Sequence, residues 1–147
     1  MIYEAQYDSM IRLAYVTTDS LAAAEDIVQD AFLDLYRNLP DIDDPVRWLH
    51  RVVANRSTSW LRRLIVARRY LQRAVVETDH PPPDSGRTAV RRGLSRLGPR
   101  YRAAVFLRYY LDLSEADIAA ALGCRPGTVK SLLHRALTRL REHLDED

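Results

Sequence analysis

The sequence of 147 residues contains little of what would place it outside the globular proteins of the cytoplasm. It has one cysteine, so it can form no internal disulfide and has no cysteine pair for a structural zinc. No apolar run approaches the roughly 18 residues that a membrane-spanning helix needs. The first ten residues carry acids and no basic cluster, unlike a signal peptide. We therefore expect a cytoplasmic protein with no direct membrane insertion, no metal and no other cofactor.

The sequence also offers little for catalysis. Its four histidines have no spacing typical of metal ligands or of a nucleophile with its base. There is no phosphate-cradling glycine loop and no G-x-S-x-G motif. The single cysteine, Cys124, adjoins a turn, where we expect a small buried residue in preference to a redox sensor. We expect no enzymatic activity.

Strand-like alternation of apolar and polar residues is absent over any useful length, which predicts an all-α protein. Apolar residues at helical spacing predict helices over about 2–16, 21–38, 45–69, 99–111 and 126–144, with shorter ones from 87 and from 115. The segment HPPPDSG cannot continue a helix and predicts a proline-rich linker over 70–86. The chain is therefore expected to form two small helical domains, 1–69 and 87–147.

Charge is strongly segregated along the chain. Residues 1–46 hold ten acids and two arginines, whereas residues 47–76 hold eight arginines and no acid. Residues 87–110 and 124–141 are basic again. This pattern indicates separate surfaces for basic and acidic partners. The near absence of lysine, with Lys130 alone, we attribute to a GC-rich coding sequence in preference to phosphate recognition.

The third predicted helix has two different faces. One side is mostly apolar and comprises Leu49, Val52, Val53, Arg56, Trp60 and Leu64. The other side comprises Arg51, Asn55, Thr58 and Arg62. An arginine stripe is usually a solvated face, but no carboxylate is interleaved here to neutralise it. We therefore favour phosphate binding on that side.

The C-terminal segment has the pattern of a helix-turn-helix, two helices joined by a tight turn that contains glycine. Ser114 is placed to cap the first helix, Gly123 ends it, and Arg125-Pro126-Gly127 forms the turn. In the last helix the buried stripe is expected to comprise Val129, Leu133, Ala136, Leu137, Leu140 and Leu144. The outward face is expected to comprise Thr128, Lys130, Ser131, His134, Arg135 and Thr138. Short hydrogen-bonding side chains with cations, and no acid between Asp117 and Glu142, are typical of a major-groove reader.

Three segments, in order, resemble one family. They are AEDIVQDAFLDLY (24–36), WLHRVVANRSTSWLRR (48–63) and LSEADIAAALGCRPGTVKSLLHRALTRLR (113–141). They resemble regions 2.2, 2.3–2.4 and 4.2 of the extracytoplasmic-function (ECF, group IV) sigma factors of the sigma-70 family. The resemblance implies a sigma region 2 bundle over 1–69 and a region 4 helix-turn-helix over 87–147. It implies an alternative sigma factor that binds core RNA polymerase, recognises the minus-ten and minus-thirty-five promoter elements and promotes DNA melting.

The resemblance also implies roles for individual residues. Asp26, Gln29 and Asp30 would bind the β′ coiled coil of core RNA polymerase, and the β flap is the second implied polymerase contact. The minus-ten element would be bound by Trp48, Arg51, Asn55 and Arg62, although Trp48 is equally well explained as a core residue. The minus-thirty-five element would be read by Arg125, Thr128, Lys130, Ser131, His134 and Arg135.

Two features depart from the family pattern. The position after Ser131 is commonly arginine, but this chain has Leu132, which falls at the border of the apolar stripe and removes one expected DNA contact. The loop over 40–44 is short. The family also implies an anti-sigma factor as partner, and we expect no C-terminal regulatory domain after the last helix.

An alternative interpretation is a helix-turn-helix transcriptional regulator whose N-terminal helices dimerise or sense a ligand. Such a protein would bind duplex DNA without being a polymerase subunit. The segment 24–36 discriminates the two, because an ordinary dimerisation helix has no reason to carry that motif.

Overall fold

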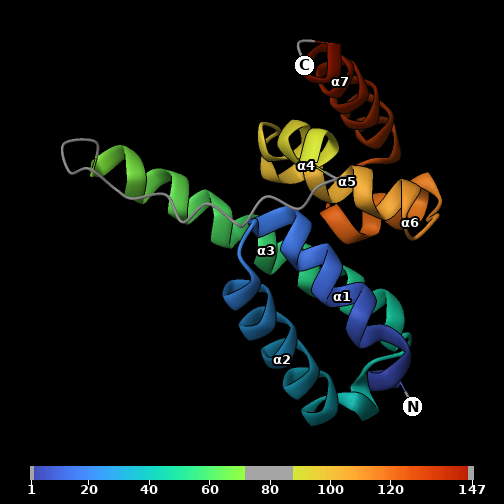
Figure 1. The fold of residues 1–147 in the computed structure, drawn as a ribbon. Coiled ribbons are helices and arrows are strands. Elements are labelled where there is room, and N and C mark those ends of the chain that lie inside the picture. The colour runs from blue at the N-terminus through green and yellow to red at the C-terminus, as the bar shows by residue number, and fades with distance from the viewer. Residues whose placement is uncertain (1, 72–87, 146–147) are drawn as a thin grey trace.

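The computed structural model describes residues 2–71 and 88–145, and within them every regular element is a helix (Figure 1). The elements are α1 (Ile2–Thr18), α2 (Leu21–Arg37), a 3-10 turn (Leu39–Asp41), α3 (Pro45–Tyr70), α4 (Thr88–Ser95), α5 (Pro99–Tyr109), α6 (Glu115–Leu122) and α7 (Pro126–Asp145). The prediction of an all-α fold is confirmed. Residues 72–86 of the expected linker lie outside the described residues, and Tyr70 still belongs to α3.

Side-chain caps and turns set the helix boundaries much as the sequence predicts. The Ser20 hydroxyl accepts from the Ala23 N–H at 3.2 Å to start α2. The Asp44 carboxylate accepts from the Arg47 N–H at 3.2 Å, just before the proline that opens α3. Ser114 caps α6 in the same way at 3.1 Å. Gly123 then ends α6 at φ +67°, a left-handed conformation that glycine adopts without strain.

One hydrophobic core runs through both halves of the chain. It includes Met10 and Leu13 of α1, Leu49 of α3, Leu107 of α5 and Ile118 of α6, all fully buried. Helices α1, α2 and α3 pack on one another, as do α5, α6 and α7. Contacts of α1 with α5 and of α3 with α6 join these two groups, while the C-terminal part of α3 extends away from the other helices (Figure 1).

The predicted division of α3 into an apolar and a basic face is wrong in part. Thr58, expected on the exposed basic side, is 6% exposed, and His50, Ala54 and Ser57 are buried as well. The reason is that α3 is covered from more than one side, because α1 and α2 pack on it and α6 packs on it too. A helix with neighbours on several sides has a wider buried stripe than periodicity alone indicates.

A buried arginine links the two halves. Arg102 of α5 is 7% exposed and donates from Nη1 to the carbonyl oxygen of Thr17 in α1 at 3.1 Å. Its Nε donates to the Leu97 carbonyl at 2.9 Å, and Nη2 donates to the Ser95 carbonyl. Burial lowers the pKa of Arg102 from its ordinary value, and the Asp19 carboxylate opposes that shift.

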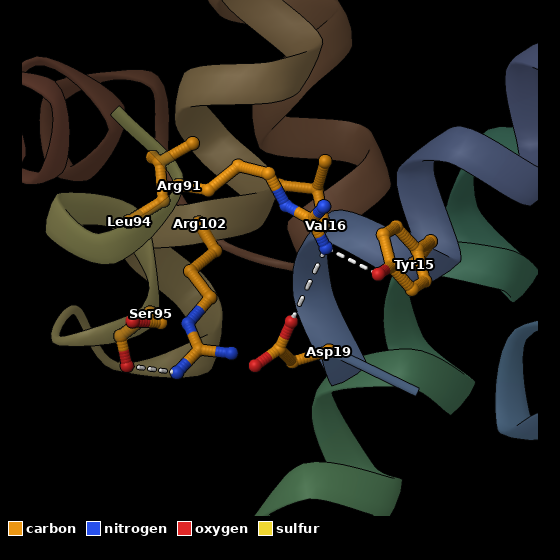
Figure 2. Close-up of a pocket in the computed structure, with 7 residues that line it drawn as sticks. All are labelled: Tyr15, Val16, Asp19, Arg91, Leu94, Ser95 and Arg102. Carbon is orange, nitrogen blue, oxygen red and sulfur yellow. Dashed lines mark hydrogen bonds and ion pairs between the residues drawn. The ribbon is translucent and has the colours of Figure 1, made fainter. Parts of the chain in front are cut away.

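A second arginine reinforces this contact beside it. Figure 2 shows Arg91 of α4 reaching both Tyr15 and Asp19 at the end of α1. The Arg91 guanidinium lies 4.8 Å from the centre of the Tyr15 ring, and its Nη2 is 3.8 Å from the Asp19 carboxylate. Farther along α1, Arg12 contacts the Tyr110 hydroxyl. We call Tyr15, Asp19, Arg91 and Arg102 the clasp.

None of the helices in the described ranges is long and apolar enough to cross a membrane.

Candidate nucleic-acid interface

The residues of α3 that were expected to bind DNA fall into two environments. Arg51, Asn55 and Arg62 are exposed, and their spacing places them on one side of the helix. Trp48 is half-buried and packs against the hydrophobic core. Its indole thus has a packing role, and a role in contacting DNA stays a prediction. The three exposed side chains together can hold phosphates and offer an amide to a base edge.

The first turns of α3 meet α6 along a partly polar seam. Arg47 lies 3.5 Å from the Asp117 carboxylate of α6. His50, 8% exposed, lines a cavity of about 290 Å³ with Asp44, Arg47 and Asp117. Burial lowers the pKa of His50 below its ordinary value of 6.5, and the Asp117 and Asp44 carboxylates oppose that shift. Closure of this seam therefore favours neutral His50.

The residues of α7 and its preceding turn that were expected to bind DNA are exposed to solvent. All six residues expected to read DNA there are exposed: Arg125, Thr128, Lys130, Ser131, His134 and Arg135. The Ser131 hydroxyl donates to the Gly127 carbonyl at 3.4 Å, and Lys130 Nζ is 3.9 Å from the Glu115 carboxylate. Both are weak contacts at an exposed surface, so they leave these side chains available to a ligand.

Leu132 is buried, at 8% exposure, and it belongs to the core together with Val129 and Leu133. The sequence placed it at the border of the apolar stripe, and the structure puts it inside. An apolar side chain in this buried position stabilises the packing of α7 on α5 and α6.

The expected polymerase-binding residues lie on the outer side of α2. Asp26, Gln29 and Asp30 are exposed, while Ile27 and Val28 between them are buried. Asp26 and Asp30 line a cavity of about 460 Å³ between α2 and α3, together with Asn55, Trp60, Arg63 and their neighbours. The acidic residues of α2 and one candidate DNA-binding residue of α3 therefore border a single groove.

An ion pair fixes α3 against α2 at this groove. Arg56 Nη2 lies 2.6 Å from the Asp34 carboxylate, and both side chains are 36% exposed. The sequence assigned Arg56 to the mostly apolar face of α3. Its guanidinium is partly exposed at the groove between α2 and α3, where it pairs with Asp34.

Sequence reasoning missed the buried His50 and the contacts that Arg91 and Arg102 make between the two halves. Arg102 had a partial signal, because the next residues of its predicted helix, Ala103 and Ala104, are small and apolar. His50 also had a signal, since it falls a turn before Val53, which the sequence placed on the apolar face of the helix. Arg91 had no signal, because its contacts with Tyr15 and Asp19 depend on how the two halves meet.

The described residues contain no group of three or more histidine, cysteine, aspartate or glutamate side chains that could hold a metal ion. Cys124 is half-buried and packs against the core, and its N–H donates to the Ala119 carbonyl at 3.0 Å. Its surroundings are those of a packing residue.

Comparison with known families gives two matches that together cover most of the chain. Residues 2–65 match Sigma-70 region 2, and residues 87–140 match Sigma-70, region 4. The chain is 34% identical over 146 residues to the RNA polymerase sigma-E factor of Streptomyces coelicolor, covering 93% of this chain and 80% of that protein. It is 35% identical to the ECF RNA polymerase sigma factor SigM of Mycobacterium tuberculosis, covering 95% and 73%.

Two solved structures resemble the fold over nearly the whole chain. The sigma factor RpoE of Bartonella quintana, in complex with the anti-sigma factor NepR, matches with a TM-score of 0.81 at 24% identity. That match covers 99% of this chain and 95% of the other. CnrH, in complex with the cytosolic domain of CnrY, matches with a TM-score of 0.72 at 24% identity, covering 99% and 86%.

Proposed function

Because the chain belongs to the ECF sigma factors of the sigma-70 family, which act in transcription initiation, we propose that it is a group IV member with two separable binding domains. Residues 1–69 act as region 2, which binds core RNA polymerase and the minus-ten element. Residues 87–147 act as region 4, which binds the minus-thirty-five element. Residues 70–86 join the two.

Core polymerase binds the exposed side of α2. Asp26, Gln29 and Asp30 contact the β′ coiled coil, and the β flap contacts region 4. The support is the exposure of all three side chains beside buried Ile27 and Val28, together with the acidic balance of residues 1–46. A face of this kind suits an arginine-rich partner.

The minus-ten element binds α3. Arg51 and Arg62 hold backbone phosphates, and Asn55 contacts an unstacked base of the non-template strand. Extruding a base costs a few kcal/mol, which these contacts and stacking on Trp48 offset without ATP. The protein thereby promotes melting by binding and has no catalytic step of its own.

The minus-thirty-five element is read as duplex by α7 and the turn before it. Lys130, Ser131, His134 and Arg135 enter the major groove, while Arg125 and Thr128 hold the backbone near the start of the helix. Support comes from the exposure of the whole set and from the absence of any acid between Asp117 and Glu142. Buried Leu132 contributes no contact.

Reading both elements at once requires the two halves to separate. The names of the elements put them about 25 base pairs apart, or about 85 Å of B-DNA at about 3.4 Å per base pair. Helix α6, eight residues and so about 12 Å long, contacts both α3 and α7. The closed arrangement therefore represents a state that precedes promoter binding, and the clasp and the α3–α6 seam open when polymerase binds.

The partner that keeps this state closed in the cell is an anti-sigma factor, and the site of action is the cytoplasm, where polymerase and promoter are. One solved structure that shares this fold over 99% of the chain is a sigma factor in complex with an anti-sigma factor. A pull-down from native cells that recovers polymerase and no small inhibitor would count against this partner.

The observation that carries the proposal is the arrangement of charge on three helices. An acidic exposed face on α2 adjoins a basic exposed face on α3, and a second acid-free basic face lies on α7. A protein that binds duplex DNA alone has no use for the first of these.

Run-off transcription tests the proposal directly. Purified core polymerase is incubated with sheared genomic DNA, with and without the chain, and the transcripts are compared. New discrete transcripts that start at a shared pair of upstream elements are expected. No new transcripts, together with tight and specific DNA binding by the chain alone, would overturn the proposal in favour of a helix-turn-helix regulator.

A further inference from the structure

A polar pocket lies where the two halves meet, and two residues of the proposed DNA-binding side of α3, Asn55 and Arg62, line it. It has a volume of about 180 Å³, far above the about 10–15 Å³ that one water requires. Three helices line it. The lining residues are Asn55, Thr58 and Arg62 of α3, Arg100 of α5, and Leu122 with Gly123 at the end of α6. The pocket exists only while the halves are closed, because each contributes a wall.

The charge of this pocket is uncompensated. Two guanidinium groups line it, from Arg62 and Arg100, and no carboxylate does. Three other cavities among the described residues differ in this respect. The cavity at Arg91 includes Asp19, the cavity at His50 includes Asp44 and Asp117, and the groove at Trp60 includes Asp26 and Asp30.

Neither guanidinium group has a partner among the residues that the structure describes. Within residues 2–71 and 88–145, neither Arg62 nor Arg100 takes part in an ion pair or a side-chain hydrogen bond. By contrast, Arg91 and Arg102 at the clasp and Arg47 at the α3–α6 seam each have an acceptor in the opposite half. At this place along the contact, the described residues provide no acceptor for either arginine.

The available hydrogen-bonding groups select the chemistry of a ligand. Each arginine offers a planar fork of donors, and the exposed Asn55 amide offers two more. The Thr58 hydroxyl already donates to the Asn55 carbonyl at 3.0 Å, so it serves as a wall. A ligand with several anionic oxygens satisfies two forks at once, whereas a cation or an apolar molecule satisfies neither.

We propose that this pocket binds a small molecule bearing phosphate groups, which bridges Arg62 of α3 and Arg100 of α5 and so joins the two halves. A single bound anion supplies the acceptor that the protein lacks at this position. Under the proposed function there is a further consequence, since Asn55 and Arg62 are also assigned to the minus-ten element. The ligand and the promoter then compete for these two residues.

Isothermal titration of the full chain with pyrophosphate, at fixed ionic strength and without polymerase or DNA, tests the site. Saturable binding with one ligand per chain is expected. Arg100→Gln is expected to weaken binding at least tenfold, because it removes one of the two forks. Arg69→Gln is the matched control, since Arg69 is an exposed arginine of α3 outside the pocket, and it should bind as wild type does.

Three results would overturn the proposal. One is the absence of saturable binding by wild type up to about 10 mM pyrophosphate, and another is equal weakening by Arg100→Gln and Arg69→Gln. The third is that pyrophosphate does not bind, whereas a single-stranded oligonucleotide binds to wild type and binds more weakly to Arg100→Gln. That result would make the pocket a site for the DNA backbone. If Arg100→Gln loses helical content, Arg100→Lys replaces it, with weakening of at least threefold expected because the fork is lost.

The outcome is independent of the transcription test. Pyrophosphate binding is measured on the chain alone, so a failure to support transcription leaves it intact. Conversely, a chain that directs transcription and does not bind pyrophosphate overturns the site and not the function. Competition between pyrophosphate and a minus-ten oligonucleotide for wild type then tests whether the two ligands share Asn55 and Arg62.

Discussion

Arg102 Nη1 donates to the carbonyl oxygen of Thr17 at 3.1 Å, across 85 positions of sequence. The guanidinium is buried and donates to carbonyl oxygens at the end of α1, at the end of α4 and at Leu97 between α4 and α5. It thus ties the N-terminal half to the C-terminal half from inside the contact. The Arg91–Asp19 ion pair beside it is more exposed and contributes less.

Arg102→Met should destabilise the closed chain by about 2–4 kcal/mol. Methionine keeps much of the apolar volume but leaves the Thr17 and Leu97 carbonyls without their donor, and a buried acceptor without a partner costs about 1–3 kcal/mol. Urea unfolding measures the change. Arg125→Met, at an exposed position, should stay within about 0.5 kcal/mol of wild type, and equal effects of the two variants would contradict the role of Arg102.

Ser57→Ala should be neutral or stabilise by up to about 1 kcal/mol. The Ser57 hydroxyl is fully buried and has no hydrogen-bond partner among the described residues, so its removal relieves a desolvation penalty. Alanine also has the higher helix propensity. Thermal unfolding followed by circular dichroism shows whether Ser57→Ala raises or lowers the stability.

The adjacent residue provides the control for that prediction. Thr58 is also buried, but its hydroxyl donates to the Asn55 carbonyl at 3.0 Å. Thr58→Val keeps the shape and loses this bond, so it should destabilise by about 0.5–1.5 kcal/mol. A destabilising Ser57→Ala would show that the Ser57 hydroxyl has a partner in solution.

Acidification should weaken the closed chain through His50. Burial lowers the pKa of His50 below its ordinary value of 6.5, so the neutral form is favoured in the closed state. Between the lowered value and 6.5 the unfolded chain binds more protons than the folded chain does. The free energy of unfolding therefore falls as the pH drops below about 6.5, by at most about 1.4 kcal/mol per pH unit from one group.

Urea unfolding from pH 7.5 to 5.5 tests this linkage, and His50→Gln should flatten the profile over that range. His134→Gln removes an exposed histidine and should leave the profile as it is in wild type. The carboxylates that face His50, Asp117 of α6 and Asp44 at the N-cap of α3, oppose the lowering of the His50 pKa and limit its size. A profile of His50→Gln as steep as that of wild type would contradict the linkage.

Much of the fold could be predicted because local rules decide it. Ser20, Asp44 and Ser114 cap helices where capping residues are expected, and Gly123 ends α6 in the conformation that glycine adopts most readily. Helical spacing predicts a buried stripe of Ile27, Val28, Ala31, Phe32, Leu35 and Leu39 in the second helix. The first five are buried in α2, whereas Leu39 lies past its end and is exposed. These features depend on residues within a few positions of one another.

What the sequence did not predict depends on contacts between distant segments. Thr58 and His50 are buried because α6 packs on α3, and the position of α6 follows from a contact between the two halves. The polar pocket has the same origin, since Arg62 and Arg100 are separated by 38 positions and meet only in the closed arrangement. Helical periodicity carries no information on which helix covers which face.

Gln29→Ala combined with Asp30→Arg should abolish binding to core RNA polymerase without changing the helical content. Both side chains are exposed on α2, so their replacement disturbs no packing, and the arginine reverses the charge presented to an arginine-rich partner. Binding to core polymerase is measured by fluorescence anisotropy of the labelled chain, and helical content by circular dichroism. Asp8→Arg makes the same charge reversal at an exposed position of α1 and should bind as wild type does. If the double variant binds core polymerase with wild-type affinity, the assignment of residues 24–36 as the docking segment is wrong.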